Sequence, residues 1–108
     1  MNNYLRDRDA RKKADDETIS SLLKHGANLN NEYLIDFFFI GNTNNLKKIE
    51  DILITQGYKK YSQSKENELH MQQLINLNLM QDHLITESLE SIANENNTSF
   101  DGWGTVVN

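Results

Sequence analysis

The segment EYLIDFFFIG, residues 32–41, is the strongest indication of how this chain folds. It is rich in aromatic and branched residues, it is too short for a buried helix, and it stops at a glycine, so it predicts a β-strand. Side chains alternate between the two faces of a strand. One face would carry Tyr33, Ile35, Phe37 and Phe39, and the other Leu34, Asp36, Phe38 and Ile40. Only Asp36 interrupts this apolar pattern, which indicates a central strand with one covered face and one partly wet face.

Helical and extended patterns alternate around this strand. Helical periodicity is found at residues 14–29, 42–58 and 78–97, and strand character at residues 58–62, 68–77 and 100–107. In the first helix, Asp15 and Asp16 are expected to cap the start, because carboxylates favour a helix N-terminus. The alternation of residues 68–77 slips near Leu74 and Ile75, which predicts a bulge or a strand end there. A polar turn is expected at residues 63–67.

The resulting order is a helix followed by βαββαβ, which predicts an α+β protein with a ferredoxin-like, or split βαβ, arrangement. Two helices would cover one face of a four-stranded antiparallel sheet, and an N-terminal helix would precede them. The first and last-but-one strands are expected at the centre and the last strand at an edge. Residues 1–13 are interpreted as a charged arm or the start of a helix, and residues 14–108 as a single domain.

The last predicted strand contains the motif DGWG, formed by Asp101, Gly102, Trp103 and Gly104. We expect Asp101 and Gly102 to form a turn that redirects the chain into the closing strand. Trp103 is the only tryptophan of the chain. A large aromatic ring in a closing strand is expected to pack on the sheet rather than to contact a ligand.

Charge is distributed unevenly along the chain. Residues 1–13 hold five basic and two acidic residues, whereas residues 66–108 hold seven acidic residues and no Lys or Arg, within a formal net charge of −5. An acidic surface repels phosphate and attracts basic partners. We therefore expect a protein partner with a basic surface and no direct contact with nucleic acid. The expected contact residues are acidic, namely Glu66, Glu68, Glu87, Glu90 and Glu95, with Asp36 as a further candidate.

Reactive chemistry has little support in the sequence. The three histidines, His25, His70 and His83, show no metal-ligand spacing, and the chain has no cysteine. No nucleophile has an evident neighbouring base, so we expect no enzyme activity, no metal and no cofactor. RNA recognition by the sheet is disfavoured because residues 68–77 lack Phe, Tyr, Trp, Lys and Arg. The longest apolar run is FFFI and residues 1–13 do not form a secretory signal, so a cytoplasmic location without membrane contact is expected.

Four short motifs, taken in their order along the chain, resemble motifs of the regulator of ribonuclease activity B (RraB) family. They are KHGANL at the end of the first helix, IDFFFIG in the first strand, QGYK after the second helix and DGWGTVV near the C-terminus. The resemblance covers about residues 15–107 and implies a ferredoxin-like fold. It also implies a small acidic protein that binds ribonuclease E and restrains RNA cleavage. An alternative with the same mechanism is an immunity protein that neutralises a secreted nuclease toxin.

Overall fold

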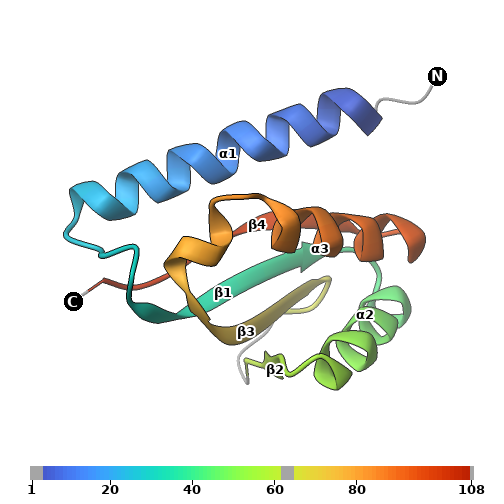
Figure 1. Ribbon diagram of the computed structural model, residues 1–108. Helices are drawn as coiled ribbons and strands as arrows, with labels where there is room; N and C mark the ends of the chain where they lie inside the picture. The colour runs from blue at the N-terminus through green and yellow to red at the C-terminus, as the bar shows by residue number, and fades with distance from the viewer. Residues whose placement is uncertain (1–3, 62–64, 108) are drawn as a thin grey trace.

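The computed structural model describes residues 4–61 and 65–107, with side chains from residue 8 onward. The described residues form three α-helices, a short 3₁₀ helix and four strands; Figure 1 shows how they are arranged. The helices are α1 (Tyr4–Lys24), α2 (Thr43–Thr55) and α3 (Leu84–Glu95), and the 3₁₀ helix spans Leu77–Met80. The strands are β1 (Glu32–Ile40), β2 (Lys59–Lys60), β3 (Glu68–Asn76) and β4 (Ser99–Gly104). The predicted α+β class is confirmed. The first part of the predicted turn at residues 63–67 lies outside the described residues.

The four strands form one sheet in the order β2-β3-β1-β4, and every neighbouring pair is antiparallel. β1 and β3 are therefore central and β4 is an edge strand, as the element order predicted. The pairing of β1 with β3 is continuous from Glu32 opposite Asn76 to Ile40 opposite Glu68. Of the two alternatives predicted near Leu74 and Ile75, the bulge was wrong, because both residues hold their places in this regular ladder, whereas the strand end agrees with the end of β3 at Asn76.

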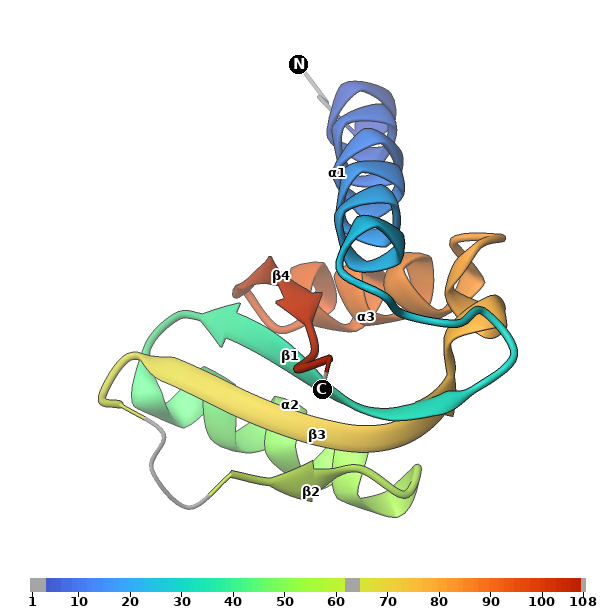
Figure 2. The same ribbon diagram turned by 90° about the vertical axis from the view of Figure 1, so that its left-hand side faces the viewer.

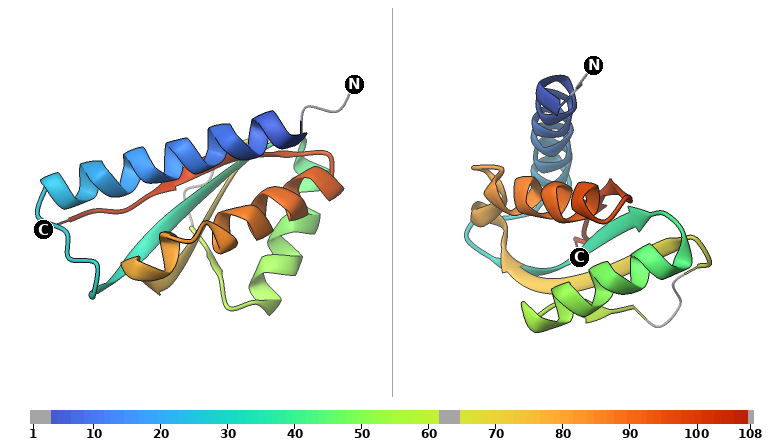
Figure 3. Two further views of the ribbon diagram at one scale, coloured as in Figure 1. Left: turned by 45° about the horizontal axis from the view of Figure 1, so that its top comes forward. Right: turned by 90° about the vertical axis from the view of Figure 1, so that its right-hand side faces the viewer.

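The two faces of β1 differ as the alternation predicted. Ile35, Phe37 and Phe39 have no solvent exposure, whereas Leu34 and Ile40 are 49% and 44% exposed. α2 and α3 lie side by side over the buried face, and the right-hand view of Figure 3 shows both helices in front of the strands. Their core side chains are Leu46, Ile49 and Leu53 from α2 and Leu89 and Ala93 from α3. The opposite face of the sheet carries no helix among the described residues.

Helix α1 lies across the edge of the sheet, beyond β4 and above α3 (Figure 2). It already includes Tyr4, so residues 4–13 agree with the second of the two interpretations, the start of a helix. Asp15 and Asp16 lie in the middle of α1, and the prediction that they cap its start was wrong. The apolar stripe near Ile19 marked only the part of the helix that packs on the core, which is why the sequence pattern began too late.

All four residues of the DGWG motif belong to β4, and Gly104 is the last residue of this strand. Phe38 pairs with Gly102 and Phe39 pairs with Phe100, so Asp101 is an extra residue in the strand. This is a β-bulge, and Gly102 supplies the left-handed φ of +125° that the distortion needs. The predicted turn at Asp101 and Gly102 was therefore wrong. The packing of Trp103 is confirmed, since it pairs with Phe37 and is only 8% exposed.

Candidate functional site

The acidic residues predicted to contact a partner do not form one cluster. Glu66 is exposed in the turn before β3, and Glu68 begins that strand. Both line a groove of 360 Å³ together with Lys47, Lys60 and Lys65, so basic side chains surround them. The other three lie along α3, where Glu87 and Glu95 are separated by about 12 Å at 1.5 Å per residue. A partner role for these residues stays a prediction.

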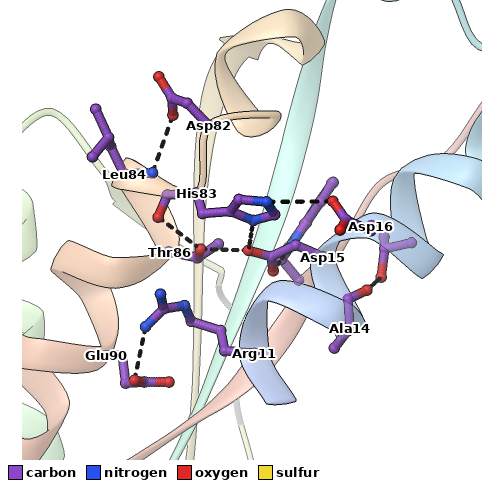
Figure 4. Close-up of polar contacts among 11 residues, drawn as sticks. Arg11, Ala14, Asp15, Asp16, Asp82, His83, Leu84, Thr86 and Glu90 are labelled. Atoms are coloured by element: carbon purple, nitrogen blue, oxygen red, sulfur yellow. Dashed lines mark hydrogen bonds and ion pairs between the residues drawn. The ribbon is translucent and has the colours of Figure 1, made fainter. Parts of the chain in front are cut away.

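Glu90 differs from its neighbours on α3 because it is engaged within the chain. Its Oε1 lies 2.8 Å from Arg11 Nη1, and the two side chains are only 14% and 6% exposed. This ion pair joins α1 to α3, as Figure 4 shows. Glu90 therefore contributes to helix packing, which the charge distribution along the sequence could not reveal.

Asp36 lies on the open face of the sheet and contacts side chains of the neighbouring strand. Its Oδ1 accepts a hydrogen bond of 2.8 Å from Gln72 Nε2 and lies 2.7 Å from His70 Nε2. His70 itself is flanked by the rings of Phe38 and Tyr61, each with its centroid 4.5 Å away. Polar and aromatic side chains thus form a row across β1, β3 and Tyr61, the residue that follows β2. A partner role for Asp36 stays a prediction.

A buried cluster that the sequence did not indicate joins α1, α3 and β4 around Asp15. This carboxylate is 2% exposed. Its Oδ1 accepts a hydrogen bond of 2.9 Å from Trp103 Nε1, and its Oδ2 accepts one of 2.6 Å from Thr86 Oγ1. His83 Nδ1 lies 3.0 Å from the same Oδ2 (Figure 4). A buried carboxylate needs such donors to offset the loss of its hydration.

His83 is positioned by an unusual backbone conformation at the start of α3. Its φ is +67°, in the left-handed region, and it occupies the cap position of the helix without a side-chain capping bond. The imidazole is instead turned toward α1, where Nε2 lies 3.3 Å from Asp16 Oδ1 while Nδ1 faces Asp15 (Figure 4). The ring therefore links two successive carboxylates of α1. A left-handed backbone at a histidine costs free energy, and the contacts of the His83 ring with α1 hold the residue in this conformation.

A groove of 580 Å³ lies between α1 and β4 and is named here the α1–β4 groove. Its described lining comes from four elements. It is formed by Ala10, Arg11, Ala14, Asp15 and Thr18 of α1, Phe38 of β1, Glu90 and Asn94 of α3, and Ser99, Phe100, Asp101, Gly102 and Trp103 of β4. Arg11 is 7% exposed, and its Nε and Nη2 are buried without a hydrogen-bond partner in the described part of the chain. Small and apolar side chains thus line the groove together with a buried arginine.

A second charged cluster lies on the other side of the molecule, between α2 and β2. Glu50 Oε1 is 3.1 Å from Lys60 Nζ, and its Oε2 is 3.1 Å from Lys47 Nζ. Burial alone raises the pKa of Glu50, but the hydrogen bonds from Lys60 and Lys47 outweigh it and hold this pKa below its ordinary value. Burial raises the pKa of Tyr58 nearby. The cluster fastens the edge of the sheet to α2.

Neither cluster has the composition of a metal centre. Within residues 4–61 and 65–107, no three His, Cys, Asp or Glu side chains are grouped so that they could hold a metal ion. No helix in this part of the chain is both long enough and apolar enough to cross a bilayer. The features that stand out are instead the buried cluster around Asp15, the α1–β4 groove and the uncovered face of the sheet. Grooves and strand edges of this kind are surfaces at which proteins bind other molecules.

Comparison with known proteins supports this conclusion. No curated protein matches the chain. The family model described as regulator of ribonuclease activity B matches residues 12–105, a range that includes α1 from its second half and all four strands. This description names the regulation of a ribonuclease rather than a catalysed reaction. The match spans far more than half of the chain. The chain therefore belongs to the regulator of ribonuclease activity B family.

Proposed function

We propose that this protein inhibits a ribonuclease of the ribonuclease E type by binding directly to it. The observation that carries the proposal is the family match over residues 12–105. The match names the regulated activity but not the manner of regulation. Direct contact is the simplest manner for a small chain whose described residues show grooves and uncovered faces but no catalytic constellation. We accordingly propose that the chain is not itself an enzyme.

Charge supports a partner with a basic surface. The formal net charge is −5, and residues 66–108 hold seven acidic residues without any Lys or Arg. Glu87 is partly exposed and Glu95 is exposed on α3, so both remain accessible to a partner. Complementary charge accelerates encounter and disfavours wrong partners, and rim charges act mainly on the association rate. The inhibitor would then dock on basic surface that the ribonuclease uses to hold RNA.

The fold agrees with the same proposal, and we also propose a cytoplasmic location. The order β2-β3-β1-β4, with α2 and α3 over one face, supports a ferredoxin-like topology to which α1 is added. The chain contains no cysteine, which suits the reducing cytoplasm where RNA is turned over. The immunity-protein alternative has no support from the family match, which names a regulator of ribonuclease activity.

The proposal is tested with the purified chain and ribonuclease E from the same organism. Cleavage of a fluorogenic RNA is followed while the chain is titrated, and binding is measured separately by calorimetry. We expect stoichiometric loss of cleavage, and a weaker complex as the salt concentration rises, because salt screens exposed charges. The double variant Glu87→Lys, Glu95→Lys should slow association, whereas Lys48→Met, on α2, should leave it unchanged. Unimpaired cleavage at a saturating concentration of the chain would contradict the proposal, as would cleavage of RNA by the chain alone.

A further inference from the structure

We propose that the α1–β4 groove binds an extended, basic peptide segment of the ribonuclease, which pairs with the outer edge of β4. The identity of the partner rests on the proposed function above. The nature of the segment rests on the geometry of the groove itself. Three observations carry it: the way β4 lines the groove, the small side chains of α1 and the balance of charge.

The groove runs along the edge of β4 rather than over one of its faces. Its lining includes all five consecutive residues from 99 to 103. Side chains alternate between the faces of a strand, so an unbroken run of five residues can line one groove only along the backbone edge. β4 is the last strand of the sheet, and only β1 pairs with it in the described residues. An edge strand presents N–H and C=O groups that an added strand can use.

The facing wall of α1 leaves room for such a strand. Ala10, Ala14 and Thr18 are spaced four residues apart, lie on one face of α1 and line the groove. Their short side chains let a neighbouring backbone approach closely. Glu90 and Asn94, spaced by one helical turn on α3, complete the floor. The volume of 580 Å³ lies within the range of sites that enclose most of a bound molecule, and it is sufficient for a few residues of extended chain.

Arg11 fixes one wall of the groove. Its Nη1 is held by Glu90 Oε1 at 2.8 Å, and the two side chains are only 6% and 14% exposed. Its Nε and Nη2 are buried from solvent, so they are closed to a molecule in the groove. The ion pair therefore keeps α1 and α3 in place on either side of the groove.

Charge decides between a basic and an acidic occupant. Three carboxylates, Asp15, Glu90 and Asp101, line the groove against the single guanidinium of Arg11. Asp15 and Glu90 are already engaged, but Asp101 is the exposed extra residue of the bulge. It can meet a Lys or Arg side chain of the bound segment, whereas a phosphate or a carboxylate would be repelled. The rings of Phe38 and Phe100 offer apolar contact to the intervening side chains.

The experiment uses the full chain, labelled with ¹⁵N, and overlapping 15-residue peptides that cover the ribonuclease E of the same organism. We expect at least one basic peptide to shift the amide signals of residues 99–103 and of the facing residues of α1. Ala14→Phe fills the groove and should weaken this binding at least 10-fold. Ser20→Phe places the same ring at an exposed position of α1 outside the groove and serves as the matched control. Methylation of alternate peptide nitrogens should abolish binding, because it removes the strand pairing.

The outcomes separate this inference from the proposed function. If the ribonuclease is bound and inhibited, but Ala14→Phe binds it as tightly as Ser20→Phe does, the groove proposal is overturned and the inhibition proposal stands. Shifts confined to the open face around Leu34 and Leu74 have the same meaning. If the intact ribonuclease is neither bound nor inhibited, both proposals fail. Melting curves of the two Phe variants show whether each is folded before its binding is interpreted.

Discussion

The two charged clusters of this protein stabilise it in different ways. The Asp15 cluster is buried, and the carboxylate is 2% exposed with donors from residues that are 68 to 88 positions away. In the Glu50 cluster the carboxylate is also buried, at 9% exposed, but its partners Lys47 and Lys60 are 62% and 49% exposed, so the cluster as a whole is more open. Lys47 is also only three residues from Glu50 in the same helix. One cluster joins three elements into a single unit, whereas the other reinforces a local contact between α2 and β2.

We expect from this difference that burial of a whole cluster, rather than the number of opposite charges, decides how much that cluster stabilises the fold. Water and salt screen an exposed ion pair, so it contributes little to stability. A buried carboxylate has lost its hydration, and the donors that replace water are then needed for folding. Substitutions in the two clusters should therefore differ in how much stability they cost.

The largest effect is expected from Asp15→Ala. The substitution leaves Trp103 Nε1 and Thr86 Oγ1 buried without an acceptor. We expect the free energy of unfolding to fall by about 3 kcal/mol, as measured by urea titration. The control is Asp16→Ala, because Asp16 is 69% exposed and lies 3.3 Å from only one nitrogen of His83. Equal losses in the free energy of unfolding for the two aspartates would show that the buried cluster stabilises the protein no more than an exposed contact does.

Trp103→Phe should cost about 2 kcal/mol, because it keeps most of the ring but removes the donor to the charged Asp15. The substitution is best measured in both the natural and the Asp15→Ala backgrounds. Since the hydrogen bond is already lost in the second background, we expect a smaller cost there. The same cost in both backgrounds would mean that packing, and not the hydrogen bond, explains the burial of Trp103.

In the second cluster, Glu50→Gln should cost about 1 kcal/mol at neutral pH, since its partners are largely solvated. The folded pKa of Glu50 lies below its ordinary value of 4.5, so its stabilisation is fully present above that value. It is lost as the pH falls through the folded pKa. Urea titrations over the acidic range should therefore show the variant and the natural chain converging. A constant difference between them at every pH would contradict this origin.

The smallest effect is expected from Lys47→Met. Asp51 and Glu50 raise the pKa of Lys47 above 10.5, so its charge contributes below that value and is lost only as the pH rises through the folded pKa. Because this side chain is 62% exposed, we expect no difference from Lys48→Met in thermal unfolding at neutral pH. A clear loss for Lys47→Met that also survives in 1 M salt would show that the open cluster acts like a buried one.

Much of the architecture was predictable because it depends on local pattern. The alternation in residues 32–40 correctly separated the buried side chains of Ile35, Phe37 and Phe39 from the exposed ones of Leu34 and Ile40. The order of the elements also placed β1 and β3 at the centre of the sheet. Apolar periodicity reports burial directly, so it succeeds wherever an element packs against the core.

The errors arose where packing between distant elements replaces the local signal. Residues 4–13 of α1 carry little apolar periodicity, so the helix start was placed too late. Asp101 and Gly102 have turn-forming residue types, but the pairing of Phe38 and Phe39 with β4 makes them a bulge. Asp15 has the composition of a helix cap, and only the neighbouring Trp103 and Thr86 reveal its role. The α1–β4 groove likewise depends on where α1 lies, which no local pattern encodes.

Residue order and side-chain chemistry were sufficient to assign the helices and strands, the covered face of β1, the central strands and the acidic character of the C-terminal half. The hydrogen bond between Asp15 and Trp103, 88 positions apart, and the groove that α1 forms along the edge of β4 became visible only in the folded chain. Hydrogen bonding and desolvation act between neighbours in space. Which residues become neighbours is fixed by the packing of whole elements.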